Sequence, residues 1–294
     1  MATAFSENLT AEQQSQVLQL FQQFQHPTLQ KDLIELKTLK KVEKGGDVLR
    51  IELQLPFAWN TGVEQVKQQL SDALLKATDS KEIKWVVNYQ IATLKRANNQ
   101  PAVKGVKNII AVTSGKGGVG KSSVSVNLAL ALQAQGARVG ILDADIYGPS
   151  VPHMLGAPHQ RPTSPDNQHI TPIKAHGLSA NSIGFLMDED NATIWRGPMA
   201  SSALSQLLNE TLWDSLDYLV IDMPPGTGDI QLTLSQQIPV TGAVVVTTPQ
   251  DIALLDAVKG VSMFERVSVP VLGIVENMSM HICSNCGPVS YTHL

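Results

Sequence analysis

The 294-residue sequence contains only two cysteines and no long apolar run. Two cysteines exclude a disulfide framework, which needs several pairs. No segment approaches the roughly 20 consecutive apolar residues of a membrane-spanning helix, and the first residues, MATAFSENLTAEQQ, lack the basic start and apolar core of a secretory signal. The net charge of −4 gives no electrostatic reason to expect nucleic acid or a membrane as a partner. We therefore expect a cytoplasmic globular protein.

The first hundred residues have the pattern of a small α/β domain. Their hydrophobic periodicity predicts two helices, over 11–24 and 63–76, and two strands, over 47–55 and 84–89. The polar stretch RANNQPAVKG, with Pro101 and Gly105, then reads as a linker. We predict a first domain over residues 1–93 and a linker over 94–107.

From residue 108 short apolar strands alternate with helical segments. The strands are NIIAVT, RVGILD, YLVID, GAVVVTT and VLGIVE. Near-continuous apolar runs of this kind suit parallel strands that are covered on both faces. The expected fold class is α/β, with a doubly wound, mostly parallel sheet over 108–287.

The segment SGKGGVGKSS, directly after the first of these strands, predicts a phosphate-binding loop. It satisfies G-x-x-x-x-G-K-[ST] between a strand and a helix, as the mechanism requires. Glycines allow backbone N–H groups to curl round phosphate oxygens, and the following helix directs its positive end at the same anion. We expect ATP to be bound by Gly115, Lys116, Gly117, Gly118, Val119, Gly120, Lys121, Ser122 and Ser123.

Charged and hydroxyl groups complete this predicted site. Lys121 is expected to reach the β- and γ-phosphates, and the Ser122 hydroxyl to ligate Mg²⁺. Asp143 and Asp145 follow the second strand, and Asp222 ends the strand YLVID. Carboxylates at the C-terminal edge of a parallel sheet face the ligand crevice. Any of the three could instead cap a helix.

A second lysine, Lys116, lies too early to be the ordinary loop lysine. The variant K-G-G-x-G-K-[ST] resembles the loop of the nitrogenase-iron-protein and septum-site ATPase class, in which this lysine crosses a dimer interface to the partner's nucleotide. The resemblance implies a catalytic cation supplied in trans, like an arginine finger; the alternative is a solvated loop lysine. It also implies that Asp222 holds Mg²⁺ through water and that Asp145 positions the attacking water. Asp143 would support the metal, and Asn277 would contact adenine unless it is an ordinary turn residue.

Both cysteines, Cys283 and Cys286, lie at CxxC spacing in HICSNCG. Two thiolates cannot complete the four-cysteine site of a [4Fe–4S] cluster, whereas a two-fold dimer supplies four. A zinc-bridged dimer is the main alternative, because tetrahedral S₄ geometry serves either metal. A redox pair, unliganded thiols, and His281 as a further ligand or a simple loop residue also remain open.

Together with DADIYGPSVP, WRGPMAS and IDMPPGTGDIQLTLSQ, this cysteine segment closely resembles the Mrp/ApbC type of iron–sulfur cluster carrier ATPase, over about 107–287. The first domain more loosely resembles the MIP18-type domain found in front of bacterial members. The resemblance implies a homodimeric ATPase that works with a cluster-assembly scaffold and passes a [4Fe–4S] cluster to apo-proteins. It also implies that the turn at 224–226 is a switch that senses the γ-phosphate.

Two other classes of function share part of this pattern. A positioning ATPase of the ParA/MinD type has the two-lysine loop but no use for the CxxC pair. A binding module would hold nucleotide only as a structural element.

Residues 288–294, PVSYTHL, match nothing in the carrier family. We expect them to be a non-native tail on a C-terminally incomplete ATPase domain.

Overall fold

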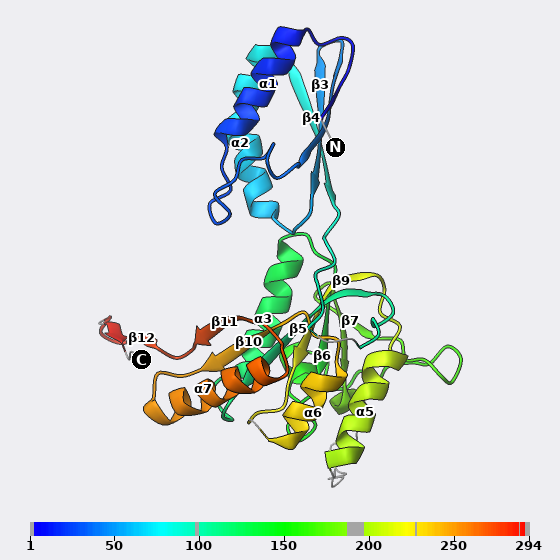
Figure 1. Cartoon of the computed structure of the whole chain (residues 1–294), viewed down its shortest axis with the longest axis vertical. Coiled ribbons are helices and arrows are strands. Elements are labelled where there is room, and N and C mark those ends of the chain that lie inside the picture. Colours follow the sequence, from blue (N-terminus) through cyan, green and yellow to red (C-terminus); the bar gives the residue numbers. More distant parts are fainter. Residues whose placement is uncertain (1–2, 98–99, 187–196, 227, 288, 292–294) are drawn as a thin grey trace. The chain divides into compact units, whose positions relative to one another are not determined.

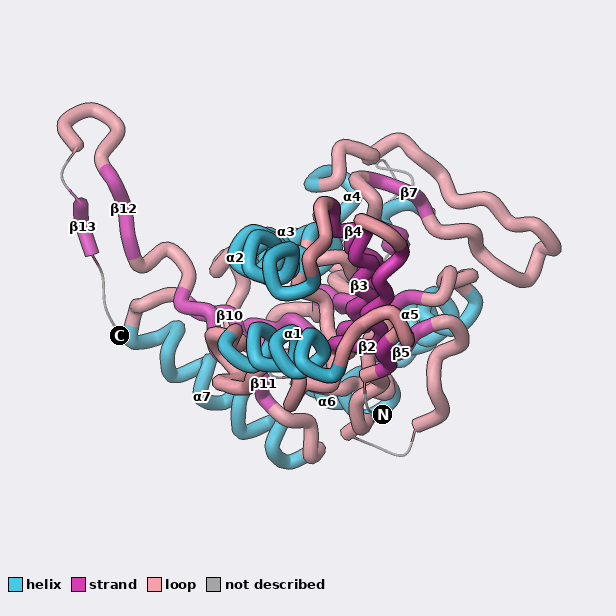
Figure 2. The backbone as a smooth tube through the Cα atoms, turned by 90° about the horizontal axis from the view of Figure 1, so that it is seen from above, coloured by secondary structure: helices cyan, strands magenta, loops and turns pink. Residues whose placement is uncertain are grey.

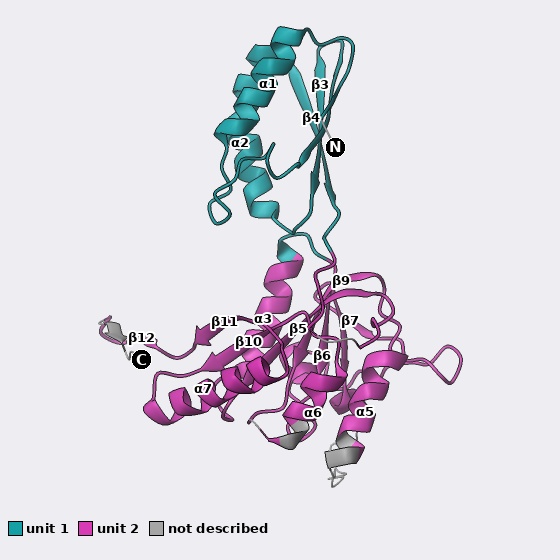
Figure 3. Ribbon diagram, viewed as in Figure 1, with its two compact units in different colours: residues 1–92, 134–137 teal, residues 93–133, 138–294 magenta. Residues whose placement is uncertain are grey.

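The computed structural model describes residues 3–97, 100–186, 197–226, 228–287 and 289–291. The chain divides into two compact units (Figure 3), one formed by Met1–Ala92 with Ala134–Ala137 and the other by Thr93–Gln133 with Arg138–Leu294. The finer division into domains over 1–93 and 108–287 with a linker at 94–107 stays a prediction. No helix in the described part of the chain combines the length and the apolar character needed to cross a membrane.

In the first unit, two helices lie on one face of a four-stranded sheet (Figure 1). The strands, in the order β1-β2-β3-β4, are Ala4–Phe5, Leu39–Gly45, Val48–Leu55 and Glu82–Tyr89. The helices are α1 (Ala11–Gln23) and α2 (Asn60–Thr78), so both predicted helices and both predicted strands are confirmed. Reciprocal hydrogen bonds between Thr10 and Gln13 start α1, satisfying backbone donors that a helix end leaves free.

The second unit is built on a seven-stranded sheet in the order β11-β10-β5-β9-β6-β8-β7. In chain order the strands β5 to β11 are Val106–Ser114, Val139–Asp143, Ile173–Ala175, Leu178–Ser182, Leu216–Asp222, Gly242–Thr247 and Val271–Glu276. Every pair is parallel except the antiparallel β7–β8 pair at one edge. The predicted α/β class with a mostly parallel sheet is confirmed.

Helices cover both faces of this sheet. The main helices are α3 (Lys121–Ala134), α5 (Gly197–Glu210), α6 (Asp229–Gln237) and α7 (Asp251–Arg266), with the short helices α4 (Val151–Met154) and η1 (Ile183–Phe185) between strands. Right-handed crossovers that run in opposite directions along a sheet place their helices on opposite faces. Accordingly α3 lies on one face, and α6 and α7 lie on the other (Figure 2).

Beyond the sheet, β12 (Met280–Ile282) pairs antiparallel with β13 (Val289–Tyr291). This small hairpin projects from the second unit as an arm (Figures 1 and 2). Of the predicted non-native tail, only 289–291 is described; 288 and 292–294 lie outside the described residues.

Asp217 at the start of β9 is bonded to a residue of β5 and to the residue directly before β6. Its carboxylate accepts hydrogen bonds from Lys107 Nζ at 2.8 Å and from Arg138 N at 2.9 Å, and the Arg138 guanidinium adds two contacts at 3.3 Å. Burial acts to raise the pKa of Asp217, but the bonds from Arg138 and Lys107 outweigh it and hold the pKa below its ordinary value. The ionised carboxylate therefore stabilises the fold.

We expect Asp217→Asn to lower the free energy of unfolding by about 1–2 kcal/mol near neutral pH, a modest value because both cationic partners also reach solvent. A group with a depressed native pKa stabilises above its unfolded pKa, and this contribution is lost as the pH falls through the native value. The difference from wild type in urea unfolding should therefore shrink on acidification. Asp214→Asn, at an exposed position just before β9, should change little at any pH.

Candidate functional site

The C-terminal ends of three adjacent strands bring the predicted nucleotide residues together. β5 ends at Ser114, β6 at Asp143 and β9 at Asp222, and Asp143 is the register partner of Asp222. A cavity of about 210 Å³ opens at this edge. Its lining comprises Ser114, Gly117, Gly118, Gly120, Lys121, Ser122, Ser123, Asp145, Ser150, Met154 and Pro225. Most of the predicted loop residues thus face one space.

A buried cluster of charge and hydroxyl groups adjoins this cavity through Lys121, Ser122 and Asp145. Lys121 Nζ lies 2.9 Å from Asp222 Oδ1 and 3.6 Å from Asp145 Oδ2. Asp222 is fully buried, and it accepts hydrogen bonds from Ser122 Oγ at 2.5 Å and Ser125 Oγ at 2.6 Å. Sequence reasoning missed Ser125. Its position three residues after Ser122, on the same face of α3, is the signal that could have identified it.

Asp143 organises the loop after β6. Its carboxylate accepts from the backbone N–H groups of Asp145 and Val151, both at 3.1 Å, and from Ser182 Oγ at 3.2 Å. Burial, together with the nearby Asp222 carboxylate, raises the pKa of Asp143 to about 7. Asp143 therefore fixes the backbone that carries Asp145, and support of a metal by Asp143 stays a prediction.

Asp145 is less buried than Asp143 and lines the cavity directly. Burial raises its pKa above the ordinary value, although the neighbouring Lys121 acts in the opposite direction. The carboxylate borders the cavity and contacts the loop lysine, and its water-positioning role stays a prediction.

Two of the loop glycines, Gly115 and Gly120, lie in close contact with neighbouring residues. Gly120 has φ +83°, and a Cβ there would lie 2.3 Å from Asn277 Nδ2. A Cβ on Gly115 would lie 2.3 Å from the carbonyl oxygen of Asp256 in α7. Asn277 uses its amide to donate to Val119 O at 2.9 Å, so in this structure it braces the loop. Its predicted contact with adenine stays a prediction.

Lys116 differs from Lys121 in its surroundings. It is exposed, whereas Lys121 is only 6% exposed, and it makes no ion pair with another residue of the described ranges. The hydroxyl of Ser114 donates to the Lys116 carbonyl at 2.8 Å, so the backbone is held while the ammonium group is left in solvent.

The turn after β9 contacts the phosphate loop through its backbone. Gly226, with φ +98°, donates to Ser114 O at 2.8 Å. The N-cap of α6 is Gly228, and Asp229 is the first helical residue. The turn is thus hydrogen-bonded to the last residue of β5, directly before the loop, and its role as a switch stays a prediction.

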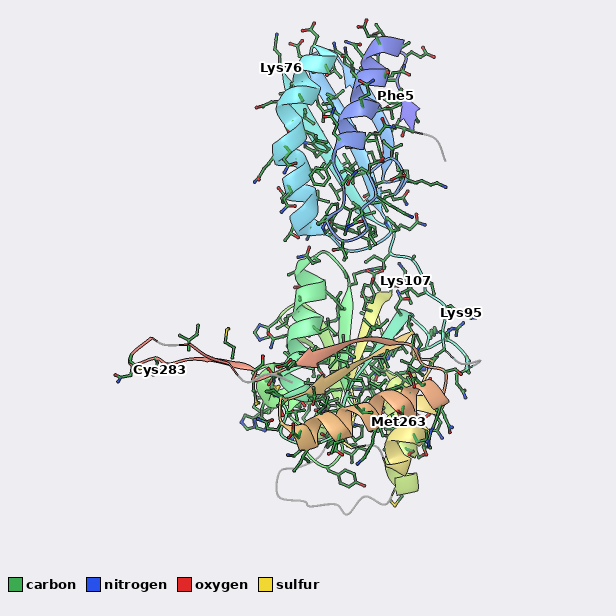
Figure 4. The ribbon with its side chains drawn as sticks, turned by 60° about the vertical axis from the view of Figure 1, so that its left-hand side comes forward. Phe5, Lys76, Lys95, Lys107, Met263 and Cys283 are labelled. Carbon is green, nitrogen blue, oxygen red and sulfur yellow. The ribbon has the colours of Figure 1, made fainter. Side chains whose placement is uncertain are left out.

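The cysteine pair lies on the projecting arm (Figure 4). Cys283 and Cys286 are free thiols, with Cys286 Sγ 3.3 Å from Cys283 Sγ. The backbone N–H of Cys286, followed by that of Asn285, lowers the pKa of Cys283 to about 7, which favours the thiolate that metals bind. No cluster of three or more His, Cys, Asp or Glu side chains suited to a metal occurs among the described residues. The side chain of His281 is not among those described.

Comparison with known proteins gives relatives for almost the whole chain. A family model described as a NUBPL iron-transfer P-loop NTPase of the ParA group matches residues 105–293. An "Iron-sulfur cluster carrier protein" of Haemophilus influenzae is 91% identical over 287 residues, which is 98% of this chain and 78% of that protein. The chain belongs to the NUBPL iron-transfer P-loop NTPase family. The resemblance to cluster carriers that the motifs indicated is thereby confirmed.

Two further proteins are similar to this NUBPL-family chain over most of their length. An Escherichia coli (strain K12) protein with the same name is 68% identical over 264 residues, covering 90% of this chain and 72% of that protein. A solved structure of a nucleotide-binding protein from Archaeoglobus fulgidus in complex with ADP is 41% identical and superimposes with a TM-score of 0.56, covering 64% of this chain and 73% of that one.

Proposed function

We propose that this NUBPL-family NTPase is an ATP-hydrolysing, homodimeric carrier that receives a [4Fe–4S] cluster from an assembly scaffold and passes it to apo-proteins. The observation that carries the proposal is a thiol pair, with Cys286 exposed and Cys283 half-buried, on an arm of a chain that also has a phosphate-binding loop. The names of the curated relatives and the ADP complex of the archaeal relative support the two halves of the proposal.

In the nucleotide half, the loop from Gly115 to Ser123 cradles the phosphates and Lys121 neutralises their charge. Asp145 orients the attacking water, and Lys116 of one protomer reaches the nucleotide of the other. Because Lys116 is exposed and unpaired among the described residues, it can make that contact without breaking one within its own chain.

Ser122 and Asp222 fit a magnesium ion. Their oxygens lie 2.5 Å apart beside the cavity, and a hydroxyl with a carboxylate is a hard-oxygen donor set of the kind that Mg²⁺ binds in nucleotide sites. Ser122 would ligate the ion and Asp222 would hold it through water. The ion supplies positive charge to the phosphate oxygens, while Ser125 keeps the Asp222 carboxylate in place.

In the carrier half, Cys283 and Cys286 of each protomer supply two thiolates to a cluster that the dimer holds as cargo. Four cysteine thiolates are the ligand set of a cubane cluster, and the described part of one chain offers two. A two-fold axis between the arms brings equivalent residues together. A cluster held at exposed arms remains accessible to an acceptor.

A transfer assay tests the proposed function. Protein reconstituted with iron and sulfide without oxygen is mixed with an apo-ferredoxin, and the acceptor's visible absorption is followed after the two proteins are separated. We expect the acceptor to gain a cluster as the carrier loses its own, also in the presence of an iron chelator. An acceptor that remains apo, or that is loaded only through chelatable iron, would contradict the carrier function.

We expect Ser122→Ala to lower magnesium-dependent ATP turnover on the order of a hundredfold, because the hydroxyl is a direct metal ligand in the proposal. The measurement is steady-state phosphate release across a magnesium titration. Ser164→Ala, at an exposed loop position, is the matched control and should equal wild type. A Ser122→Ala protein with normal magnesium dependence would remove Ser122 from the metal site.

A further inference from the structure

Gln231 in the first turn of α6 is a buried polar side chain that the proposed function does not use. It is 2% exposed, and its side-chain amide donates to Thr113 Oγ1 of β5, which is 1% exposed. Its Oε1 has no hydrogen-bond partner among the residues that the structure describes. Reversing the amide does not resolve this, because the NH₂ group would then lack an acceptor. One polar atom of Gln231 is unsatisfied in either orientation, and such an atom costs free energy.

The contact between Gln231 and Thr113 is continuous with the phosphate loop. Thr113 is followed by Ser114, whose hydroxyl donates to Lys116 O and whose carbonyl accepts from Gly226 N, both at 2.8 Å. The end of β5 is thus bonded to the loop, to the turn after β9 and to α6. Because all three segments are bonded to the end of β5, we expect movement of one segment to shift the positions of the other two.

The helix α6 also borders a cavity. A cavity of about 950 Å³ lies between α5 and α6, and its lining includes Leu204, Leu208, Thr233, Leu234 and Ile238. With 9 residues, α6 is below the length at which an isolated helix is stable in water. Its position therefore depends on tertiary contacts, which include the bond to Thr113 and the packing of Leu234 and Ile238 in the core.

We propose that Gln231 is a positioning residue that latches the start of α6 to β5 and so links α6 to the state of the phosphate loop. The inference rests on the proposed nucleotide function for its role in turnover, whereas the latch itself is a property of the chain alone. A nucleotide that favours one position of the phosphate loop then also favours one position of α6.

Hydrogen exchange of the full chain tests the latch without nucleotide. Gln231→Leu keeps the side-chain size but removes the bond, and we expect exchange of the α6 amides to become about tenfold faster. The urea midpoint should stay equal or rise, because the unsatisfied oxygen is also removed. Gln237→Leu, the same change at an exposed position of α6, is the control. Unchanged α6 exchange in Gln231→Leu would overturn the latch.

A second variant distinguishes loss of the bond from a change that the leucine side chain itself causes in the packing of α6. Thr113→Val removes the other partner and should accelerate α6 exchange at least as much, because it leaves the buried Gln231 amide without its acceptor. Because both variants break one contact, the double variant should be no faster than Thr113→Val alone. Effects that add in the double variant would show that the two residues act separately, and would overturn the proposal.

The rate of ATP turnover then shows whether Gln231 has a positioning role or a purely structural one. We expect Gln231→Leu to bind ADP with unchanged affinity but to hydrolyse ATP about tenfold more slowly. Equal turnover in a variant with faster α6 exchange would overturn the positioning role. Absence of ATP hydrolysis in the wild-type protein would contradict the proposed function instead, while the exchange experiment would still decide the latch.

Discussion

Replacing Lys116 with alanine is expected to slow ATP hydrolysis by about three to five orders of magnitude while nucleotide affinity changes little. A cation supplied in trans acts on charge that develops on the transferred phosphoryl group, so its loss affects the transition state more than binding. The exposed ammonium of Lys116 contrasts with Lys121, which is buried against Asp222. Single-turnover hydrolysis and calorimetric ADP binding measure the two effects.

Mixed dimers show whether the lysine acts across the interface. Lys116→Ala combined with Asp145→Ala places one intact site in each heterodimer, because each protomer supplies what the other lacks. With random pairing, about a quarter of wild-type activity should return. Lys104→Ala, an exposed lysine in the same unit, is the control for loss of charge. Mixtures as inactive as their components would contradict action in trans.

Replacing both Cys283 and Cys286 with alanine is expected to remove all bound cluster iron and leave ATP hydrolysis within about twofold of wild type. Thiolates ligate iron and have no part in phosphoryl transfer. The pair also lies on the arm (Figure 4), and neither cysteine lines the nucleotide cavity. Iron and acid-labile sulfide assays after anaerobic reconstitution, with phosphate release on the same sample, give both values.

Ser284→Ala, between the two cysteines and exposed like Cys286, controls for changes in the arm and should bind a full cluster. Iron retained in the double variant would show that the ligands lie elsewhere in the chain. Loss of ATP hydrolysis together with the iron would contradict the separation of the two chemistries.

The sequence predicts those parts of the fold that depend on local pattern. The apolar run NIIAVT lies within β5 (Val106–Ser114), and the other four predicted parallel strands are confirmed. β2 could not be predicted, because in LKKVEKG only Leu39 and Val42 are apolar. β8 has the sequence LSANS and is wholly buried. Its Asn181 is satisfied by a bond to Thr211, a contact that only the folded chain creates.

In the site, too, features that follow from local sequence pattern could be predicted, whereas contacts between distant residues could not. A phosphate-binding loop is predictable because its glycines and Lys121 are adjacent in the sequence, and carboxylates at strand ends follow from the parallel topology. The bond from Asn277 to Val119 joins residues 158 positions apart, and that from Gln231 to Thr113 joins residues 118 apart. Contacts of that separation leave no periodic signal in the sequence.

The metal content of the anaerobically reconstituted dimer tests the central claim most directly. Native mass spectrometry, with iron and sulfide assays on the same sample, gives chains, metal and sulfide per particle. A cubane held by two thiolates from each protomer predicts about four iron and four sulfide per two chains. One zinc per two chains without acid-labile sulfide would contradict the carrier account and identify the thiol pair as a zinc bridge.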